Sequence, residues 1–213
     1  MDLSFPVELL AGFMSEPRKT HWHAALRILR FLRATPDRGI FYSAHVEGRP
    51  GDIRLLGWTD LDWAGELDSC RSTTGYCFTL GTSVISWSSK KHPTVALSST
   101  EAEYRAACTG TCEAVWLRRL LGELGFPQQA STTIYSDNQS CLAIAKNPVF
   151  HARTKPIEVQ YHYIREKLLD GTVSLVYCPT AENLADLFTK ALQQSVVTEH
   201  SRSLGLLPHP GSA

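Results

Sequence analysis

The sequence lacks long apolar runs, an excess of charge of either sign, and any targeting segment. No stretch of its 213 residues approaches the roughly 20 apolar residues that a membrane span needs, so no membrane partner is expected. Its 21 lysine and arginine residues are balanced by 21 aspartate and glutamate residues. This balance excludes a protein surface that is basic throughout, although a local group of basic residues on one part of the surface remains possible. The N-terminus has no basic segment followed by an apolar core, so secretion is not indicated and an intracellular protein is expected.

Clustered cysteines are also missing. The chain has no Cys-x-x-Cys pair and no His/Cys group at zinc spacing. A disulfide framework remains possible because the number of cysteines is even, but a chain of this length without a signal peptide favours reduced thiols that fill core space. The six positions are Cys70, Cys77, Cys108, Cys112, Cys141 and Cys178.

The first fifty residues are predicted to be helical and then extended. Apolar residues between 6 and 14 form a first short helix, and a second runs from 21 to 34. A strand is expected to begin at 40, and turn residues at 48–52 form a linker. The apolar residues of the second helix recur at helical spacing and are expected to face a core: Trp22, Leu26, Leu29 and Leu32.

The remaining chain predicts an α/β domain with a mixed sheet and flanking helices. Four short strands come first, followed by a long helix, a strand, two helices, a strand and a last helix. The expected ranges are 53–59, 75–80, 84–88 and 94–97, then 99–125, 132–136, 138–146, 157–169, 172–178 and 181–192. The long helix is expected to bury a stripe of Tyr104, Cys108, Val115, Leu120 and Leu124. The domains are therefore an appendage at 1–50, a main domain at 51–193 and a flexible tail at 194–213.

Four carboxylates stand on four separate elements. Asp60 and Asp137 follow predicted strands, Glu103 lies one turn into the long helix, and Asp186 lies in an apolar part of the last helix. Gathered at one sheet edge, they would repel one another unless divalent cations neutralised them, and hard oxygen ligands favour Mg²⁺ or Mn²⁺. Two such ions can activate water and stabilise the leaving oxygen in phosphodiester cleavage. Each carboxylate alone has an ordinary alternative as a turn, helix-cap or surface residue, so spacing does not decide between the two.

Several ordered motifs between residues 55 and 192 resemble the ribonuclease H domain of copia-type retrotransposon Pol polyproteins. They begin with Gly-Trp-Thr-Asp-Leu-Asp-Trp-Ala-Gly-Glu at 57–66, and they continue at 71–76, 85–91, 96–104, 137–140, 147–151 and 185–190. The segments 13–17 and 27–32 resemble the end of the reverse transcriptase region of the same polyproteins. The polymerase signature Tyr-x-Asp-Asp is absent, so no polymerase activity is expected from this chain.

The resemblance implies a ribonuclease H-like fold, with a five-stranded sheet whose first three strands are antiparallel. It implies a metal-dependent endoribonuclease that cleaves the RNA strand of RNA/DNA hybrids. The expected cofactors are two Mg²⁺ ions, with Mn²⁺ as a substitute, and no small-molecule cofactor. The catalytic and metal-binding residues carry over to Asp60, Glu103, Asp137 and Asp186, with Asp62 and Glu101 as near neighbours. The implied partners are the hybrid and the rest of a reverse transcriptase, in a cytoplasmic virus-like particle or in the nucleus.

A hybrid needs cationic and hydroxyl contacts along its backbones. Candidates lie after a predicted strand, at a predicted helix N-terminus and before the helix at 157–169. They are Lys90 and Lys91, then Asn138, Gln139 and Ser140, and finally Arg153 and Lys155.

The sequence departs from the family pattern at two places. Pro156 stands where the family has a histidine, and the short loop at 178–182 lacks the histidine that cellular ribonucleases H carry there. The alternative function is therefore an inactive retroelement relic that binds nucleic acid or a polymerase partner. A related nuclease or integrase-like phosphotransferase on the same fold is a weaker possibility.

Overall fold

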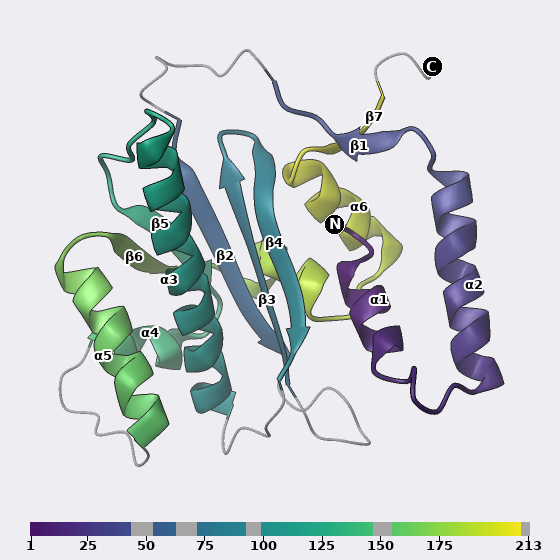
Figure 1. Ribbon diagram of the computed structural model, residues 1–213, viewed down its shortest axis with the longest axis horizontal. Helices are drawn as coiled ribbons and strands as arrows, with labels where there is room; N and C mark the ends of the chain where they lie inside the picture. Colours follow the sequence, from purple (N-terminus) through teal and green to yellow (C-terminus); the bar gives the residue numbers. More distant parts are fainter. Residues whose placement is uncertain (44–52, 63–71, 93–98, 147–154, 210–213) are drawn as a thin grey trace.

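A computed structural model describes residues 1–43, 53–62, 72–92, 99–146 and 155–209 (Figure 1). A central sheet lies between two layers of helices, and a pair of N-terminal helices stands beside its outer strand, β4. Within these ranges, every helix is too short or too polar to cross a membrane.

The central sheet has the strand order β4-β3-β2-β5-β6. Its first three strands are antiparallel, whereas β5 runs parallel to β2 and β6 runs parallel to β5. The strands are β2 (Leu55–Asp62), β3 (Thr73–Leu80), β4 (Ser83–Lys91), β5 (Thr132–Ser136) and β6 (Val173–Tyr177). The predicted mixed sheet is confirmed, while the strand expected at 94–97 lies outside the described residues.

One face of the sheet is covered by α3 (Ser99–Glu123), α4 (Gln139–Lys146) and α5 (Lys155–Leu169). The main core lies between these helices and the sheet and includes Phe78, Ile134 and Ile164. The predicted stripe of α3 was wrong toward its C-terminus. Leu117 and Leu121 are four residues apart, so they lie on the same side of the helix, and both are buried against the sheet. Leu124 is exposed.

The opposite face is covered by two short 3₁₀-helices and by α6 (Gln194–Ser203). The single helix predicted at 181–192 is wrong, because Asn183 interrupts it between η1 (Thr180–Glu182) and η2 (Leu184–Phe188). The backbone of Asn183 is extended, its Oδ1 accepts a hydrogen bond from the Ala185 N–H, and its Nδ2 donates one to the Thr59 carbonyl of β2. The loop thereby fixes η2 against the central strand.

The C-terminal segment is ordered structure, so the prediction of a flexible tail from 194 onward is wrong for residues 194–208. Helix α6 leads into β7 (Leu206–Pro208), which pairs antiparallel with β1 (Arg38–Ile40). Leu204 is fully buried, and its carbonyl accepts a hydrogen bond from the Val84 N–H. The segment is therefore fastened both by apolar burial and by backbone pairing.

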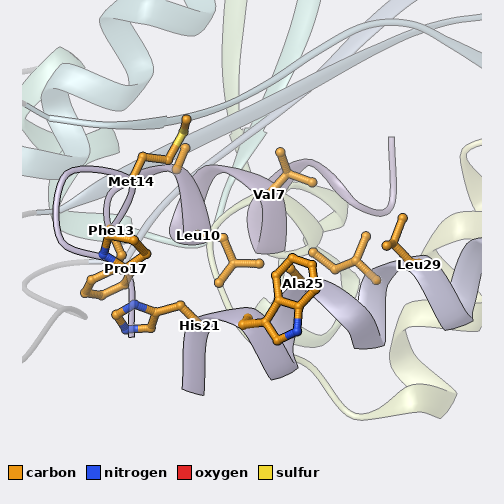
Figure 2. A pocket seen from close by; sticks show the side chains of 11 residues that line it. Val7, Leu10, Phe13, Met14, Pro17, His21, Ala25 and Leu29 are labelled. Carbon is orange, nitrogen blue, oxygen red and sulfur yellow. The ribbon is translucent and has the colours of Figure 1, made fainter. Parts of the chain in front are cut away.

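The N-terminal helices α1 (Ser4–Ala11) and α2 (Lys19–Ala34) enclose an apolar groove of about 460 Å³ (Figure 2). The prediction that the apolar residues of α2 face a core is wrong for three of them. Trp22, Leu29 and Leu32 are 63%, 58% and 50% exposed. The helical spacing was correct, but α1 is too short to cover the apolar side of α2. We call this surface the α1–α2 groove.

We predict that Leu204→Ala lowers the free energy of unfolding by about 3 kcal/mol, because it leaves a cavity at a fully buried site. Urea unfolding measures the loss. Leu169→Ala, at a side chain that is 84% exposed, is the matched control and should cost less than about 0.5 kcal/mol. Equal stabilities of the two variants would contradict the packed arrangement of the C-terminal segment.

Candidate metal centre at the sheet edge

The parallel pairing of β2 with β5 brings two of the predicted carboxylates to one sheet edge. Gly57 and Trp58 of β2 align with Ile134 and Tyr135 of β5. Asp60 comes two residues later in β2, and Asp137 directly follows β5. Because parallel strands end at the same side of a sheet, both side chains emerge there, where open α/β sheets usually bind ligands.

Two glycines allow helical segments to approach this edge closely. A Cβ at Gly75, which pairs with Asp60, would lie 2.7 Å from Cγ2 of Thr189 and 2.8 Å from Cβ of Phe188. A Cβ at Gly110 would lie 2.4 Å from Cγ2 of Thr59, directly before Asp60. Glycine at these positions lets η2 and α3 pack directly on β2 and β3.

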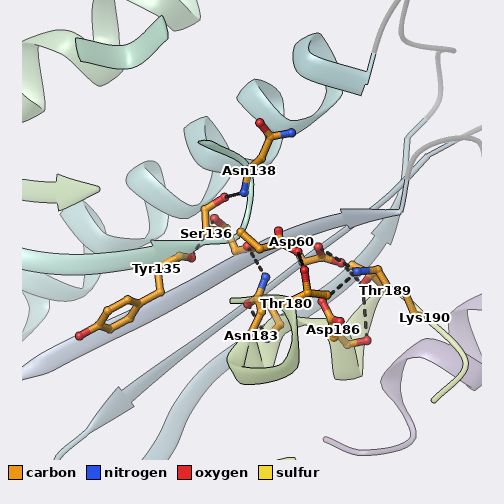
Figure 3. Close-up of polar contacts among 12 residues, drawn as sticks. Asp60, Tyr135, Ser136, Asn138, Thr180, Asn183, Asp186, Thr189 and Lys190 are labelled. Atoms are coloured by element: carbon orange, nitrogen blue, oxygen red, sulfur yellow. Dashed lines mark hydrogen bonds and ion pairs between the residues drawn. The ribbon is translucent and has the colours of Figure 1, made fainter. Parts of the chain in front are cut away.

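The close approach of η2 adds a third carboxylate, that of Asp186. Oxygen atoms of Asp60, Asp137 and Asp186 all lie within 4.8 Å of one another. Asp60 and Asp186 are buried, whereas Asp137 is partly exposed. Figure 3 shows Asp60 and Asp186 with the polar residues around them. We call these three residues the carboxylate cluster.

Hydrogen bonds and ion pairs hold the carboxylate cluster in place. Lys190 Nζ lies 3.0 Å from Asp186 Oδ1 and 3.3 Å from Asp60 Oδ1 (Figure 3). The hydroxyl of Thr189 donates to the other oxygen of Asp60. The hydroxyl of Thr180 donates to Asp137 Oδ2 at 2.7 Å. None of these three residues was predicted as a site residue, although Lys190 stands four positions after Asp186 within the motif at 185–190.

Burial makes negative charge costly in this cluster. Burial raises the pKa of Asp60, and Lys190 and Thr189 only partly offset the increase. Burial, together with the charge of Asp60, raises the pKa of Asp186 to about 7. Burial lowers the pKa of Lys190, but the charges of Asp60 and Asp186 outweigh this effect, so its pKa is raised and the ammonium stays charged.

The fourth predicted carboxylate, Glu103, stands beside the cluster rather than within it. Its oxygens are not part of the group whose atoms lie within 4.8 Å of one another. Burial and the charges of Asp60 and Asp137 nevertheless raise the pKa of Glu103 to about 8, so it shares their electrostatic field. Asp62, at the end of β2, also has a raised pKa because of burial and the charge of Asp60.

Some of the predicted nucleic-acid residues lie at the sheet edge that bears the cluster, and Arg153 lies outside the described residues. Across the strands, Asp62 pairs with Thr73 and Thr73 pairs with Lys91, so the end of β4 lies at the edge that bears the cluster. Lys90 is exposed there, and Lys91 is partly exposed.

Helix α4 begins just after Asp137, with Gln139 and Ser140 exposed in its first turn. The side chain of Asn138 caps this helix by accepting a hydrogen bond from the Cys141 N–H at 2.9 Å. Arg153 lies outside the described residues. Lys155 begins α5, which places Pro156 in the first turn, a position that proline tolerates.

The donor set of the cluster suits a hard divalent cation. Three carboxylates offer only oxygen ligands, which favour Mg²⁺ or Mn²⁺ over zinc. A cation there would also offset the repulsion between groups that burial keeps close to one another. The residues present therefore could bind a metal ion, through Asp60, Asp137 and Asp186.

The strand order, together with an acidic cluster on β2, after β5 and in η2, defines this chain as a domain with the ribonuclease H-like fold. Comparison with curated proteins shows that homologues of this chain are copia-type retrotransposon Pol polyproteins. It is 41% identical over 211 residues to the retrovirus-related Pol polyprotein from transposon RE2 of Arabidopsis thaliana. The match covers 99% of this chain but 14% of that polyprotein, so the chain spans about one seventh of its relative.

Two further comparisons are weaker or shorter. The chain is 48% identical over 116 residues to Secreted RxLR effector protein 161 of Plasmopara viticola. This match covers 54% of this chain and 78% of that protein. The solved structure of LC11 ribonuclease H1, isolated from compost, superposes with a TM-score of 0.48 at 14% identity, covering 69% of this chain and 97% of that one. No protein-family profile matches the chain.

We predict a pH-dependent gain in stability for Glu103→Gln in EDTA. The pKa of Glu103 is raised from 4.5 to about 8 in the folded chain. The stability that its protonated form contributes is fully present below pH 4.5 and is lost as the pH rises through 8. Between pH 5 and pH 8 the variant should therefore gain on the order of 2 kcal/mol relative to the wild type.

Urea unfolding at both pH values measures this gain. Glu123→Gln, at an exposed position near the end of α3, is the control and should follow the wild type. If Glu103→Gln and the wild type show the same pH dependence, then Glu103 does not share the field of the cluster.

Proposed function

We propose that the chain is a metal-dependent endoribonuclease that cleaves the RNA strand of RNA/DNA hybrids. The observation that carries the proposal is the meeting of Asp60, Asp137 and Asp186 at one edge of a ribonuclease H-like sheet. Homology to Pol polyproteins supports the choice of substrate, since reverse transcription produces such hybrids. This substrate also favours action inside the cell, where those hybrids form.

Asp60, Asp137 and Asp186 would hold Mg²⁺, with Glu103 close enough to influence their charge. The bound metal would supply an activated water and would neutralise the charge that develops on the scissile phosphate. The protein's own part is to fix the carboxylates. Thr180 orients Asp137, Thr189 orients Asp60, and Asn183 fastens η2 to β2.

The hybrid would lie along the sheet edge that bears the cluster. Lys90 and Lys91 at the end of β4 offer cationic contacts to the phosphate backbone. On the other side of the cluster, the first turn of α4 presents the side chains of Gln139 and Ser140. Arg153 and Lys155 remain further candidates. Phosphate contacts on both sides would position the cleaved strand over the carboxylates.

The alternative is an inactive relic that binds hybrid without cleaving it. The charge balance favours the enzyme, because three clustered carboxylates would weaken the binding of a phosphate backbone unless metal neutralised them. Single-turnover cleavage measured beside hybrid binding separates the two. Tight binding with no cleavage in Mg²⁺ or Mn²⁺ would favour the relic.

We predict that Asp137→Asn lowers the rate of hybrid cleavage about a thousandfold, equivalent to ~4 kcal/mol of transition-state stabilisation. Asp137 is partly exposed, so the exchange of carboxylate for amide should leave the fold intact. The assay follows a labelled RNA strand in an RNA/DNA hybrid with Mg²⁺ and with EDTA. Glu123→Gln should cleave like the wild type, and full activity of Asp137→Asn would refute the proposal.

We also propose that the polymerase region of a Pol polyprotein covers the α1–α2 groove. The match to the RE2 polyprotein extends over nearly the whole chain, N-terminal helices included, and that relative is about seven times longer. The groove exposes Trp22 and Leu29, and its lining is almost entirely apolar. Neighbouring apolar side chains exposed in this way usually mark an interaction surface.

We predict that Trp22→Ser with Leu29→Ser weakens binding of a separately expressed polymerase segment of the RE2 polyprotein at least tenfold, about 1.4 kcal/mol. Both side chains are more than half exposed, so the stability of the chain should change little. Isothermal titration measures the affinity, and Leu169→Ser on α5 is the exposed apolar control. Equal binding by all variants would contradict the proposal. Self-association that the double substitution abolishes would assign the groove to a second copy of this chain.

A further inference from the structure

Lys190 occupies an unusual position for a lysine. Its ammonium reaches two carboxylates of the cluster, at 3.0 Å from Asp186 Oδ1 and 3.3 Å from Asp60 Oδ1 (Figure 3). Within the described part of the chain, it is the cation that ion-pairs with the cluster. A positive charge therefore already lies against the oxygens that would bind a metal ion.

The backbone directs Lys190 to this place. Its N–H donates to the Asp186 carbonyl at 3.1 Å in the turn that ends η2, so the side chain starts beside Asp186. Thr189, the preceding residue, donates to Oδ2 of Asp60 and leaves Oδ1 for the ammonium. The pairing therefore follows from the local fold rather than from a chance surface contact.

The ammonium of Lys190 can also leave the cluster and enter solvent. The side chain of Lys190 is 30% exposed, whereas that of Asp60 is 1% exposed. A four-carbon stem with several rotatable bonds can move the charge into solvent without disturbing the packed part of the site. The carboxylates have no comparable freedom, because η2 and β2 fix them.

We propose that Lys190 is a resident counter-cation of the carboxylate cluster, which a divalent metal ion must displace in order to bind. This inference rests on the proposed metal-dependent function. An ammonium and a divalent ion cannot share Asp60 Oδ1 and Asp186 Oδ1, because like charges at such separations repel strongly. Lys190 thus stabilises the metal-free fold and lowers the affinity of the site for metal. It is a positioning residue, since it acts through the carboxylates.

Two substitutions separate the effect of the charge of Lys190 from the effect of its side-chain packing. Lys190→Met keeps most of the aliphatic stem and removes the cation, so it should tighten Mn²⁺ binding about tenfold and lower the melting temperature of the metal-free protein. Lys190→Arg keeps a cation, so its affinity for Mn²⁺ should remain within about threefold of the wild type. Lys167→Met removes a lysine of α5 that pairs with Glu166 and with Asp170 just after the helix; it is the control and should leave Mn²⁺ binding unchanged.

The experiment titrates each purified full-length variant with Mn²⁺, followed by electron paramagnetic resonance of the free ion, and records thermal melts in EDTA. Tighter binding by Lys190→Met with a lower metal-free melting temperature is the expected result. Equal or weaker binding by Lys190→Met would overturn the inference. A purely structural role would lower the melting temperature and leave the Mn²⁺ affinity unchanged, which also counts against it.

The inference and the proposed function fail in different ways. Mn²⁺ binding by Lys190→Met but not by the wild type would support the counter-cation role while arguing against metal-dependent cleavage by this chain. Equal Mn²⁺ binding by both, together with hybrid cleavage by the wild type, would overturn the inference and leave the proposed function standing. Absence of Mn²⁺ binding in both proteins would overturn the inference together with the metal centre.

Discussion

Repulsion among three carboxylates at one sheet edge is the constraint around which the rest of the site is built. Oxygens of Asp60, Asp137 and Asp186 lie within 4.8 Å of one another, and the buried pair Asp60 and Asp186 could not remain charged without compensation. Thr180, Thr189 and Lys190 provide that compensation, each from the segment that follows β6. One short segment therefore contributes both a carboxylate and most of the groups that stabilise the cluster.

The geometry of this segment depends on packing far from it in the sequence. Gly75 on β3 has no side chain that could keep η2 away, and Asn183 fastens η2 to the Thr59 carbonyl. A larger residue at position 75 would push Thr189 away from Asp60 and loosen the cluster as well as the core. Stability and the arrangement of the site are thus coupled through the same contacts.

Local sequence patterns predicted the strands of the sheet and singled out carboxylates as candidates, but they did not decide whether those carboxylates form a site. Alternating burial and turn residues define strands well, and Asp60 and Asp137 simply stand at or near strand ends. The resemblance to Pol polyproteins then favoured all four carboxylates as site residues, which no local pattern distinguishes from turn, helix-cap or surface residues. The structure then placed Asp186 within the cluster and Glu103 beside it.

The remaining features depend on long-range contacts that a local pattern does not contain. The apolar spacing of α2 predicted a helix correctly, but it could not show that α1 would leave Trp22 exposed. The polar composition after residue 194 suggested a tail, whereas burial of Leu204 and pairing with β1 order it. Lys190 was overlooked because a lysine in a helical motif is usually at the surface.

The pairing of β1 with β7 also sets an order of events during synthesis. Arg38 aligns with Pro208, and the His209 N–H donates to the Asp37 carbonyl, so this small sheet joins segments from opposite parts of the chain. Residues 206–208 must be synthesised before residues 38–40 can find their partner strand. Until then, β1 has no partner strand to anchor it and the helices α1 and α2 that precede it. Closure of this small sheet is therefore expected to be among the last steps of folding.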